Sequence, residues 1–91
     1  MKKAIHVLVE GRVQGVFYRV SAREKALALG VEGWVRHRQE GQVEIMALGP
    51  EAALSDFLAW CREGPQGTLV IGLTLHEVPQ EGLGPGFKIL D

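Results

Sequence analysis

Residues 11–19 read GRVQGVFYR, which combines two glycines, a series of backbone amides and a terminal arginine. The segment joins an expected strand, Ala4 to Glu10, to a helical pattern that begins at about Arg19, so its amides lack strand or helix partners. Such amides can converge on an oxyanion, with the positive end of the helix dipole behind them. The predicted donors are the backbone N–H groups of Gln14, Gly15, Val16, Phe17, Tyr18 and Arg19. The pattern predicts a loop that binds a phosphate or a carboxylate.

The side chain of Arg19 adds a charged donor to this loop. Its planar guanidinium can donate to two oxygens of one anion, and each charge-assisted bond contributes about 1.5–3 kcal/mol. The alternative interpretation is that Gly11 and Gly15 serve only a turn and that Arg19 lies in solvent.

The elements that must position the loop follow from hydrophobic periodicity. Apolar side chains alternate in the first strand, at Ile5, Val7 and Val9, and recur at helical spacing in two later segments. The leucine and isoleucine residues 69, 71, 73 and 75 are expected to share one face of a long strand. The expected elements are a strand at Ala4–Glu10, a helix at Arg19–Leu29, strands at Val31–Arg38 and Gln42–Leu48, a helix from Pro50 or Glu51 to Glu63, and strands at Thr68–Val78 and Phe87–Leu90.

The order β-α-β-β-α-β with an added short strand predicts a ferredoxin-like α/β sandwich, in which an antiparallel sheet carries two helices on one face. In that fold the loop after the first strand can lie close to the end of the second strand. The end of the second strand, GWVRH at residues 33–37, therefore joins the predicted site.

Composition sets the class of protein. The chain has 91 residues, 46% hydrophobic and 23% charged, which is typical of one globular domain over residues 1–91. Its single cysteine, Cys61, cannot form an internal disulfide and is expected in the core, and no Cys/His spacing resembles a metal site. No run reaches the roughly 18 apolar residues that cross a bilayer, so we expect a cytoplasmic protein without a membrane partner.

Charge is distributed unevenly although the net charge is only −1. Basic side chains are in excess over residues 1–38 and acidic side chains over the remainder. A basic region around the loop would raise the local concentration of a small anion. RNA binding on the sheet is the competing interpretation, but basic residues are not interleaved with aromatic residues in the stacking pattern such sheets use. We therefore expect no nucleic-acid partner.

The same residues resemble the acylphosphatase family over nearly the whole chain. The resemblance is carried by the VQGV loop that ends in Tyr18-Arg19, by GWVR at residues 33–36, by Gly41, and by the Gly-Pro pairs at 49–50 and 64–65. It implies a small hydrolase that cleaves the carboxyl–phosphate bond of acyl phosphates, releasing a carboxylate and inorganic phosphate without metal or organic cofactor. We expect generic small acyl phosphates as substrates, and a monomer because 91 residues form a single small core. The family's phosphate-binding arginine matches Arg19, and its loop amides match residues 14–19.

The chain departs from the family pattern at His37, where the family has an asparagine that holds the attacking water. A neutral imidazole has one acceptor and one donor nitrogen, so His37 can orient a water or accept its proton. The ring is also bulkier than an amide, so a weakened enzyme is a second interpretation. A module that binds phosphate-like anions without efficient turnover is the third.

Overall fold

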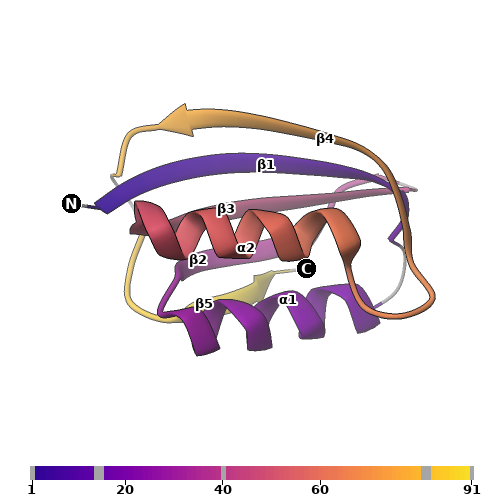
Figure 1. Ribbon diagram of the computed structural model, residues 1–91, viewed down its shortest axis with the longest axis horizontal. Helices are drawn as coiled ribbons and strands as arrows, with labels where there is room; N and C mark the ends of the chain where they lie inside the picture. The colour runs from indigo at the N-terminus through magenta and orange to yellow at the C-terminus, as the bar shows by residue number, and fades with distance from the viewer. Residues whose placement is uncertain (1, 14–15, 40, 81–82, 91) are drawn as a thin grey trace.

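The computed structural model describes residues 2–13, 16–39, 41–80 and 83–90 (Figure 1). Their order along the chain is the expected one, with two helices set between strands. The elements are β1 (Lys2–Arg12), α1 (Val16–Leu29), β2 (Glu32–His37), β3 (Gln42–Pro50), α2 (Glu51–Glu63), β4 (Leu69–Val78) and β5 (Phe87–Leu90).

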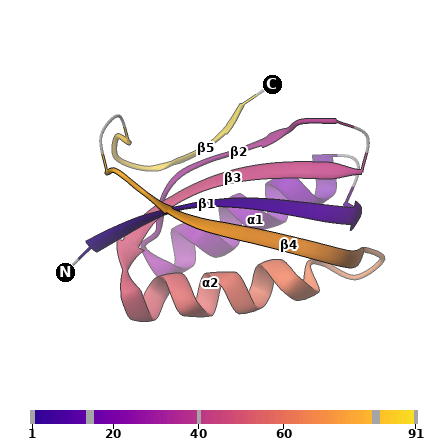
Figure 2. The same cartoon turned by 90° about the horizontal axis from the view of Figure 1, so that it is seen from above.

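The strands form one sheet in the order β4-β1-β3-β2-β5, as Figure 2 shows from above. Both helices lie on one face of this sheet, and the opposite face is not covered by a helix (Figure 1). The first four strands pair antiparallel. The ferredoxin-like fold predicted from the sequence is therefore confirmed.

The added strand β5 differs from the expected antiparallel arrangement, because it pairs parallel to β2. The reason is which end of the sheet β4 leaves from. Val78, at the end of β4, lies opposite Ala4 of β1, and Ala4 lies opposite Leu48 of β3. Leu48 lies opposite Glu32, at the start of β2. The chain thus leaves β4 at the end of the sheet where β2 begins. After crossing that end, it enters β5 in the direction of β2.

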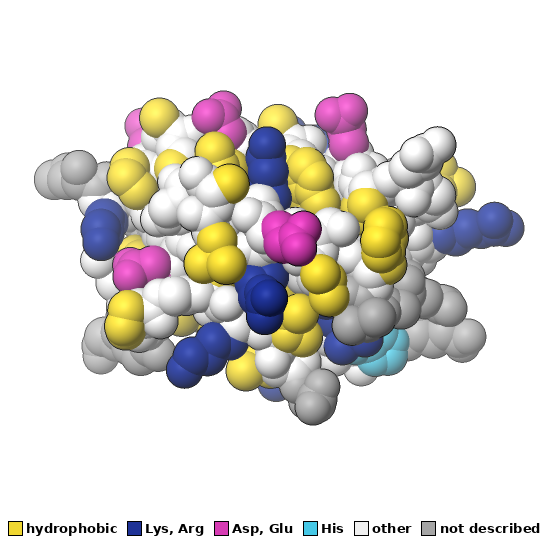
Figure 3. Space-filling view, turned by 90° about the horizontal axis from the view of Figure 1, so that it is seen from below, with side chains coloured by type: hydrophobic (Ala, Val, Ile, Leu, Met, Phe, Trp, Pro, Cys, Tyr) yellow, Lys and Arg dark blue, Asp and Glu magenta, His cyan; other side chains and the backbone are white. Residues whose placement is uncertain are grey.

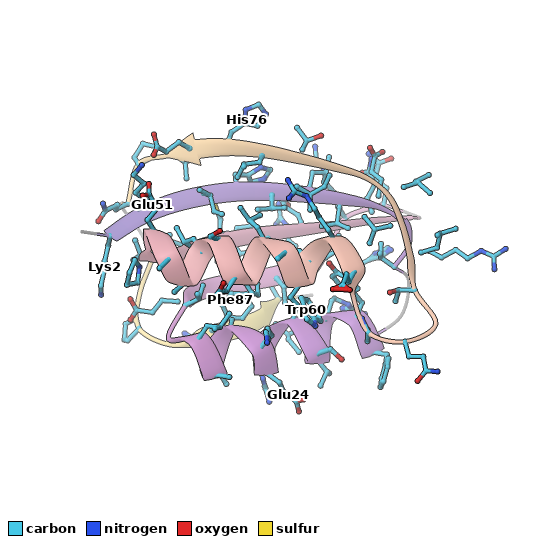
Figure 4. All side chains as sticks on the ribbon, viewed as in Figure 1. Lys2, Glu24, Glu51, Trp60, His76 and Phe87 are labelled. Atoms are coloured by element: carbon cyan, nitrogen blue, oxygen red, sulfur yellow. The ribbon has the colours of Figure 1, made fainter. Side chains whose placement is uncertain are left out.

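The core lies between the sheet and the two helices. Alternation along β1 buries Val7 and Val9 completely on the helix side, as the sequence pattern predicts. Aromatic rings fill the space between the helices: the Phe57 ring lies 6.3 Å from Trp60 and 5.8 Å from Phe87. Figure 4 shows Trp60 and Phe87 in this layer. Cys61 is also fully buried, as expected.

The prediction that residues 69, 71, 73 and 75 share one face of β4 is wrong for the first half of the strand. The pairing register between β1 and β4 shifts between Glu10 and Gly11, which is the mark of a β-bulge. Leu73 and Val70 pack against the core, whereas Leu69 and Ile71 are 57% and 76% exposed. A bulge inserts an extra residue into a strand, so strict alternation fails across it.

Helix α1 begins at Val16, earlier than the expected start near Arg19. The segment that was predicted as loop therefore includes the first helical turn, whose N–H groups lack intrahelical partners. Within the described ranges, neither helix is long and apolar enough to cross a membrane.

Candidate anion-binding site

Three chain segments meet at one end of the sheet: the end of β1, the start of α1 and the end of β2. Helix α1 packs against β2 and runs back along the sheet, so its N-terminus lies at the end where β2 finishes (Figure 1). Within the sheet, Val43 pairs with both Val9 and His37, which places His37 two strands from β1. His37 shares the helix side of β2 with the buried Val35. The structure thus brings the start of α1 and His37 to the same end.

Gly11 directs the chain out of β1 toward this site. Its φ of 138° is a conformation that side chains other than glycine rarely adopt, and a Cβ there would overlap the carbonyl oxygen of Leu69. Its N–H donates to the carbonyl of Gly41 in the hairpin between β2 and β3, at 3.0 Å. Gly11 therefore ties the end of β1 to the hairpin that follows His37.

The first turn of α1 supplies the backbone donors. The N–H groups of Val16, Phe17 and Tyr18 lie at the helix N-terminus, where the helix dipole is positive. The predicted N–H donor of Arg19 belongs to the same turn, whereas the predicted donors Gln14 and Gly15 lie outside the described residues. The Tyr18 side chain points into the core, where its hydroxyl donates to the carbonyl of Cys61 at 2.9 Å. Tyr18 can therefore serve an anion only through its backbone.

Arg19 follows directly in the same turn. Its side chain is half-buried, and the Nε atom is buried without a hydrogen-bond partner among the described residues. Leaving a buried charged donor unsatisfied costs about 1–3 kcal/mol or more, so such an atom is unusual in a purely structural position. A guanidinium left open beside a helix N-terminus has the donor set that a phosphate requires.

His37 is exposed at the end of β2. The neighbouring residues Arg36 and Arg38 are also exposed, and the backbone N–H of Arg38 donates to the carbonyl of Gln42 at 3.2 Å as the hairpin begins. Figure 3 shows the molecule from below, on the side where α1 lies. Of the side chains that the structure describes, the basic and acidic ones are scattered singly among apolar ones there and do not form one charged patch on that face.

A polar cluster on the uncovered face of the sheet was not predicted from the sequence. Glu44 is 8% exposed and holds Arg36 Nε at 2.6 Å through Oε1 and His6 Nε2 at 2.6 Å through Oε2. Burial alone would raise the pKa of Glu44, but the hydrogen bonds from His6 and Arg36 outweigh it, so the pKa is lowered. The signal in the sequence is the opposite charge of Arg36 and Glu44, but only the register of the hairpin makes them direct partners.

Metal-binding groups are not assembled in the described part of the chain. No group of three or more His, Cys, Asp or Glu residues lies close enough there to hold a metal ion. The donors described above are backbone amides and a guanidinium.

Comparisons with known proteins identify relatives along the whole chain. The sequence profile of the Acylphosphatase family matches residues 5–89. The acylphosphatase of Methylococcus capsulatus is 48% identical over 88 residues, which cover 97% of this chain and 96% of the relative. That of Rubrobacter xylanophilus is 45% identical over 87 residues, covering 96% of this chain and 79% of the relative.

The fold agrees with solved structures of the same family. The crystal structure of acylphosphatase from Bacillus subtilis superposes with a TM-score of 0.91 at 35% identity and covers both chains completely. The structure of an acylphosphatase from Coxiella burnetii gives a TM-score of 0.92 at 36% identity, covering 98% of this chain and 93% of that one. Fold, profile and sequence identity agree, and the chain belongs to the acylphosphatase family.

Proposed function

We propose that this chain hydrolyses the carboxyl–phosphate bond of small acyl phosphates. The family assignment supports this reaction, and the observation that carries it to specific residues is the buried Nε of Arg19, which has no partner among the described residues and lies in the first turn of α1. These donors match the oxygens of a phosphoryl group in charge. The acyl part is left open, since nothing in the described donors selects it.

Arg19 and the backbone N–H groups of residues 14–19 bind the phosphoryl group in this proposal. As the bond to the carboxylate breaks, negative charge is spread over the three equatorial oxygens of the phosphoryl group. Donors that are already fixed in place stabilise this charge without having to reorganise. An acyl phosphate is already activated, since its leaving group is a carboxylate. The reaction therefore needs neither a metal nor an organic cofactor.

His37 holds the attacking water in the proposed mechanism. Its side chain is on the helix side of β2, at the end of the sheet where α1 begins. A neutral imidazole nitrogen accepts a hydrogen bond from the water, whose oxygen attacks phosphorus while the bond from phosphorus to the carboxylate oxygen breaks. The water contributes its oxygen to inorganic phosphate, its protons go to phosphate and solvent, and the carboxylate leaves with the bonding electrons.

We further propose that the chain acts as a monomer in the cytoplasm, without a nucleic-acid or membrane partner. The support is its small single core and its one cysteine, which is buried and reduced. Gel filtration with light scattering at enzyme-assay concentrations tests the monomer.

The deciding experiment is phosphate release from a small aryl acyl phosphate by the purified protein and two variants. Arg19→Ala should lower kcat/KM at least about a hundredfold and weaken inhibition by inorganic phosphate. Arg23→Ala is the matched control, since it removes an exposed arginine one turn further along the same helix. Phosphate binding without turnover by the wild-type chain would instead support an anion-binding module. Equal rates in Arg19→Ala and wild type would remove Arg19 from the mechanism.

A further inference from the structure

We propose that Glu44 is a positioning residue for this hydrolysis: through Arg36 it fixes the end of β2 and thereby the imidazole of His37. The inference rests on the proposed function, in which His37 holds the attacking water. Glu44 itself lies on the face of the sheet that the helices leave uncovered, so it has no direct contact with the site.

The carboxylate of Glu44 connects three neighbouring strands. It extends from β3, receives Arg36 of β2 on one oxygen and His6 of β1 on the other, each at 2.6 Å. An ionised carboxylate is acceptor only, so both partners must donate to it. Both oxygens are thus used, and the cluster links β1, β3 and β2 by side chains in addition to the backbone ladder.

Arg36 is held from a second direction by an aromatic ring. Its guanidinium carbon lies 5.2 Å from the centre of the Trp34 ring, within the range of a cation–π contact. Glu44 and Trp34 together restrict a long side chain that would otherwise sample many rotamers. Because Arg36 is directly opposite Glu44 in the register, this restraint acts on the β2 backbone at that pair.

His37 lies at a point of the sheet that depends on this restraint. The described part of β5 ends at Leu90, opposite Arg36, so Arg36 is the last residue of β2 that the described sheet pairs on both sides. His37 is the next residue and pairs with Val43 of β3. The contact with Glu44 is therefore the side-chain anchor immediately before the strand end that presents His37.

Loss of the contact between Glu44 and Arg36 should disturb the position of the attacking water more than the binding of phosphate. In the proposed function the phosphate is bound by Arg19 and the first turn of α1 on the helix side of the sheet, and the water depends on His37, whereas Glu44 lies on the opposite face. A shift of about 1 Å in a positioning group can cost up to about a hundredfold in rate. Removing Glu44 should therefore separate the two parts of the site kinetically.

The test compares Glu44→Ala with Glu32→Ala. Glu44→Ala should lower kcat about tenfold and leave the inhibition constant of inorganic phosphate unchanged. Glu32 lies on the same face of the sheet, at the other end of β2, and its contact is with Lys2 at 3.5 Å. Glu32→Ala should therefore leave both constants unchanged. Arg36→Met removes the same contact at an exposed position and should reproduce the fall in kcat. It therefore keeps the proposal testable if Glu44→Ala does not fold.

A double-mutant cycle with His37→Ala makes the assignment specific. If Glu44 acts through His37, then Glu44→Ala should cause no further fall in kcat once His37 is absent. Glu44→Gln keeps a carbonyl oxygen for Arg36 and should restore most of the rate. The proposal is overturned by an unchanged kcat in both Glu44→Ala and Arg36→Met, by an equal fall in the His37→Ala background, or by an equal loss of phosphate binding.

A readout independent of turnover separates this proposal from the proposed function. The imidazole C–H resonances of His37 in the NMR spectrum should shift or broaden in Glu44→Ala and Arg36→Met, and stay unchanged in Glu32→Ala. A wild-type chain without turnover would contradict the proposed function, whatever the spectra show. Unchanged His37 resonances in both anchor variants would contradict the role of Glu44, whatever the activity.

Discussion

The hydroxyl of Tyr18 donates a 2.9 Å hydrogen bond to the backbone carbonyl of Cys61, which joins the first turn of α1 to the last turn of α2. The last carbonyls of a helix lack intrahelical partners, and Tyr18 satisfies one of them inside the core. The Tyr18 ring also packs 5.4 Å from the Trp60 ring. A core contact thus fixes the turn that carries Arg19.

Tyr18→Phe should lower the free energy of unfolding by about 1–3 kcal/mol, because the ring is kept while the buried carbonyl of Cys61 loses its donor. Urea denaturation followed by tryptophan fluorescence measures the change. Activity per folded molecule should stay close to wild type, since the backbone N–H of Tyr18 remains. A loss of stability below about 0.5 kcal/mol would show that water replaces the hydroxyl.

Gly64→Ala should be clearly more destabilising than Gly67→Ala. Both glycines have positive φ, at 68° and 94°, so both variants pay a backbone cost of about 1–2 kcal/mol. At Gly64 a Cβ would also overlap the hydroxyl of Thr68 and lie 2.9 Å from a Tyr18 ring carbon, whereas nothing lies within 4 Å at Gly67. Thermal unfolding of the two variants measures the difference, and equal melting temperatures would contradict the steric argument.

The thiol of Cys61 should be unreactive in the folded protein. Burial raises its pKa to about 12, so little thiolate is present at pH 8, and the sulfur is fully buried. Reaction with an aromatic disulfide reagent should be at least about a hundredfold slower in buffer than in concentrated urea. A rapid reaction of the native protein would mean that the end of α2 opens frequently.

Stability at acid pH should depend on Glu44. Its pKa is lower in the folded chain than in the unfolded chain, so its contribution is complete above the unfolded value of about 4.3 and is lost as the pH falls through the folded value. The free energy of unfolding of the wild type should therefore decrease more steeply below about pH 5 than that of Glu44→Gln. Urea denaturation at several pH values compares the slopes, with Glu32→Gln as the charge-matched control. Parallel slopes in wild type and Glu44→Gln would contradict the assignment.

His37→Ala should lower kcat about a hundredfold, since the attacking water loses its holder, while inorganic phosphate should inhibit as before. His37→Asn should keep or raise the activity, because an amide can hold the same water. His76→Ala serves as the control, since His76 is exposed on the edge strand β4, away from the helices (Figure 4). Equal rates in wild type and His37→Ala would show that the nucleophile is positioned by another group.

The sequence by itself determined the order of the elements and the buried face of β1, and it predicted where an anion would bind. Each rests on local information: alternation at Val7 and Val9, helical spacing, and glycine with arginine at fixed offsets around a helix start. The resemblance to acylphosphatases used the same residues. The comparisons confirm the family, and the roles of Arg19 and His37 remain predictions that the geometry supports.

Only the tertiary structure decided the features that depend on register and crossing. The bulge at Gly11 turned Leu69 and Ile71 outward, and the exit of β4 at the start of β2 made β5 parallel. The partnership of Glu44 with Arg36 and His6 also needs the pairing of three strands. A period of two residues is visible in a sequence, but a shift of one residue between strands exchanges every neighbour, so cross-strand contacts appear only when the sheet is assembled.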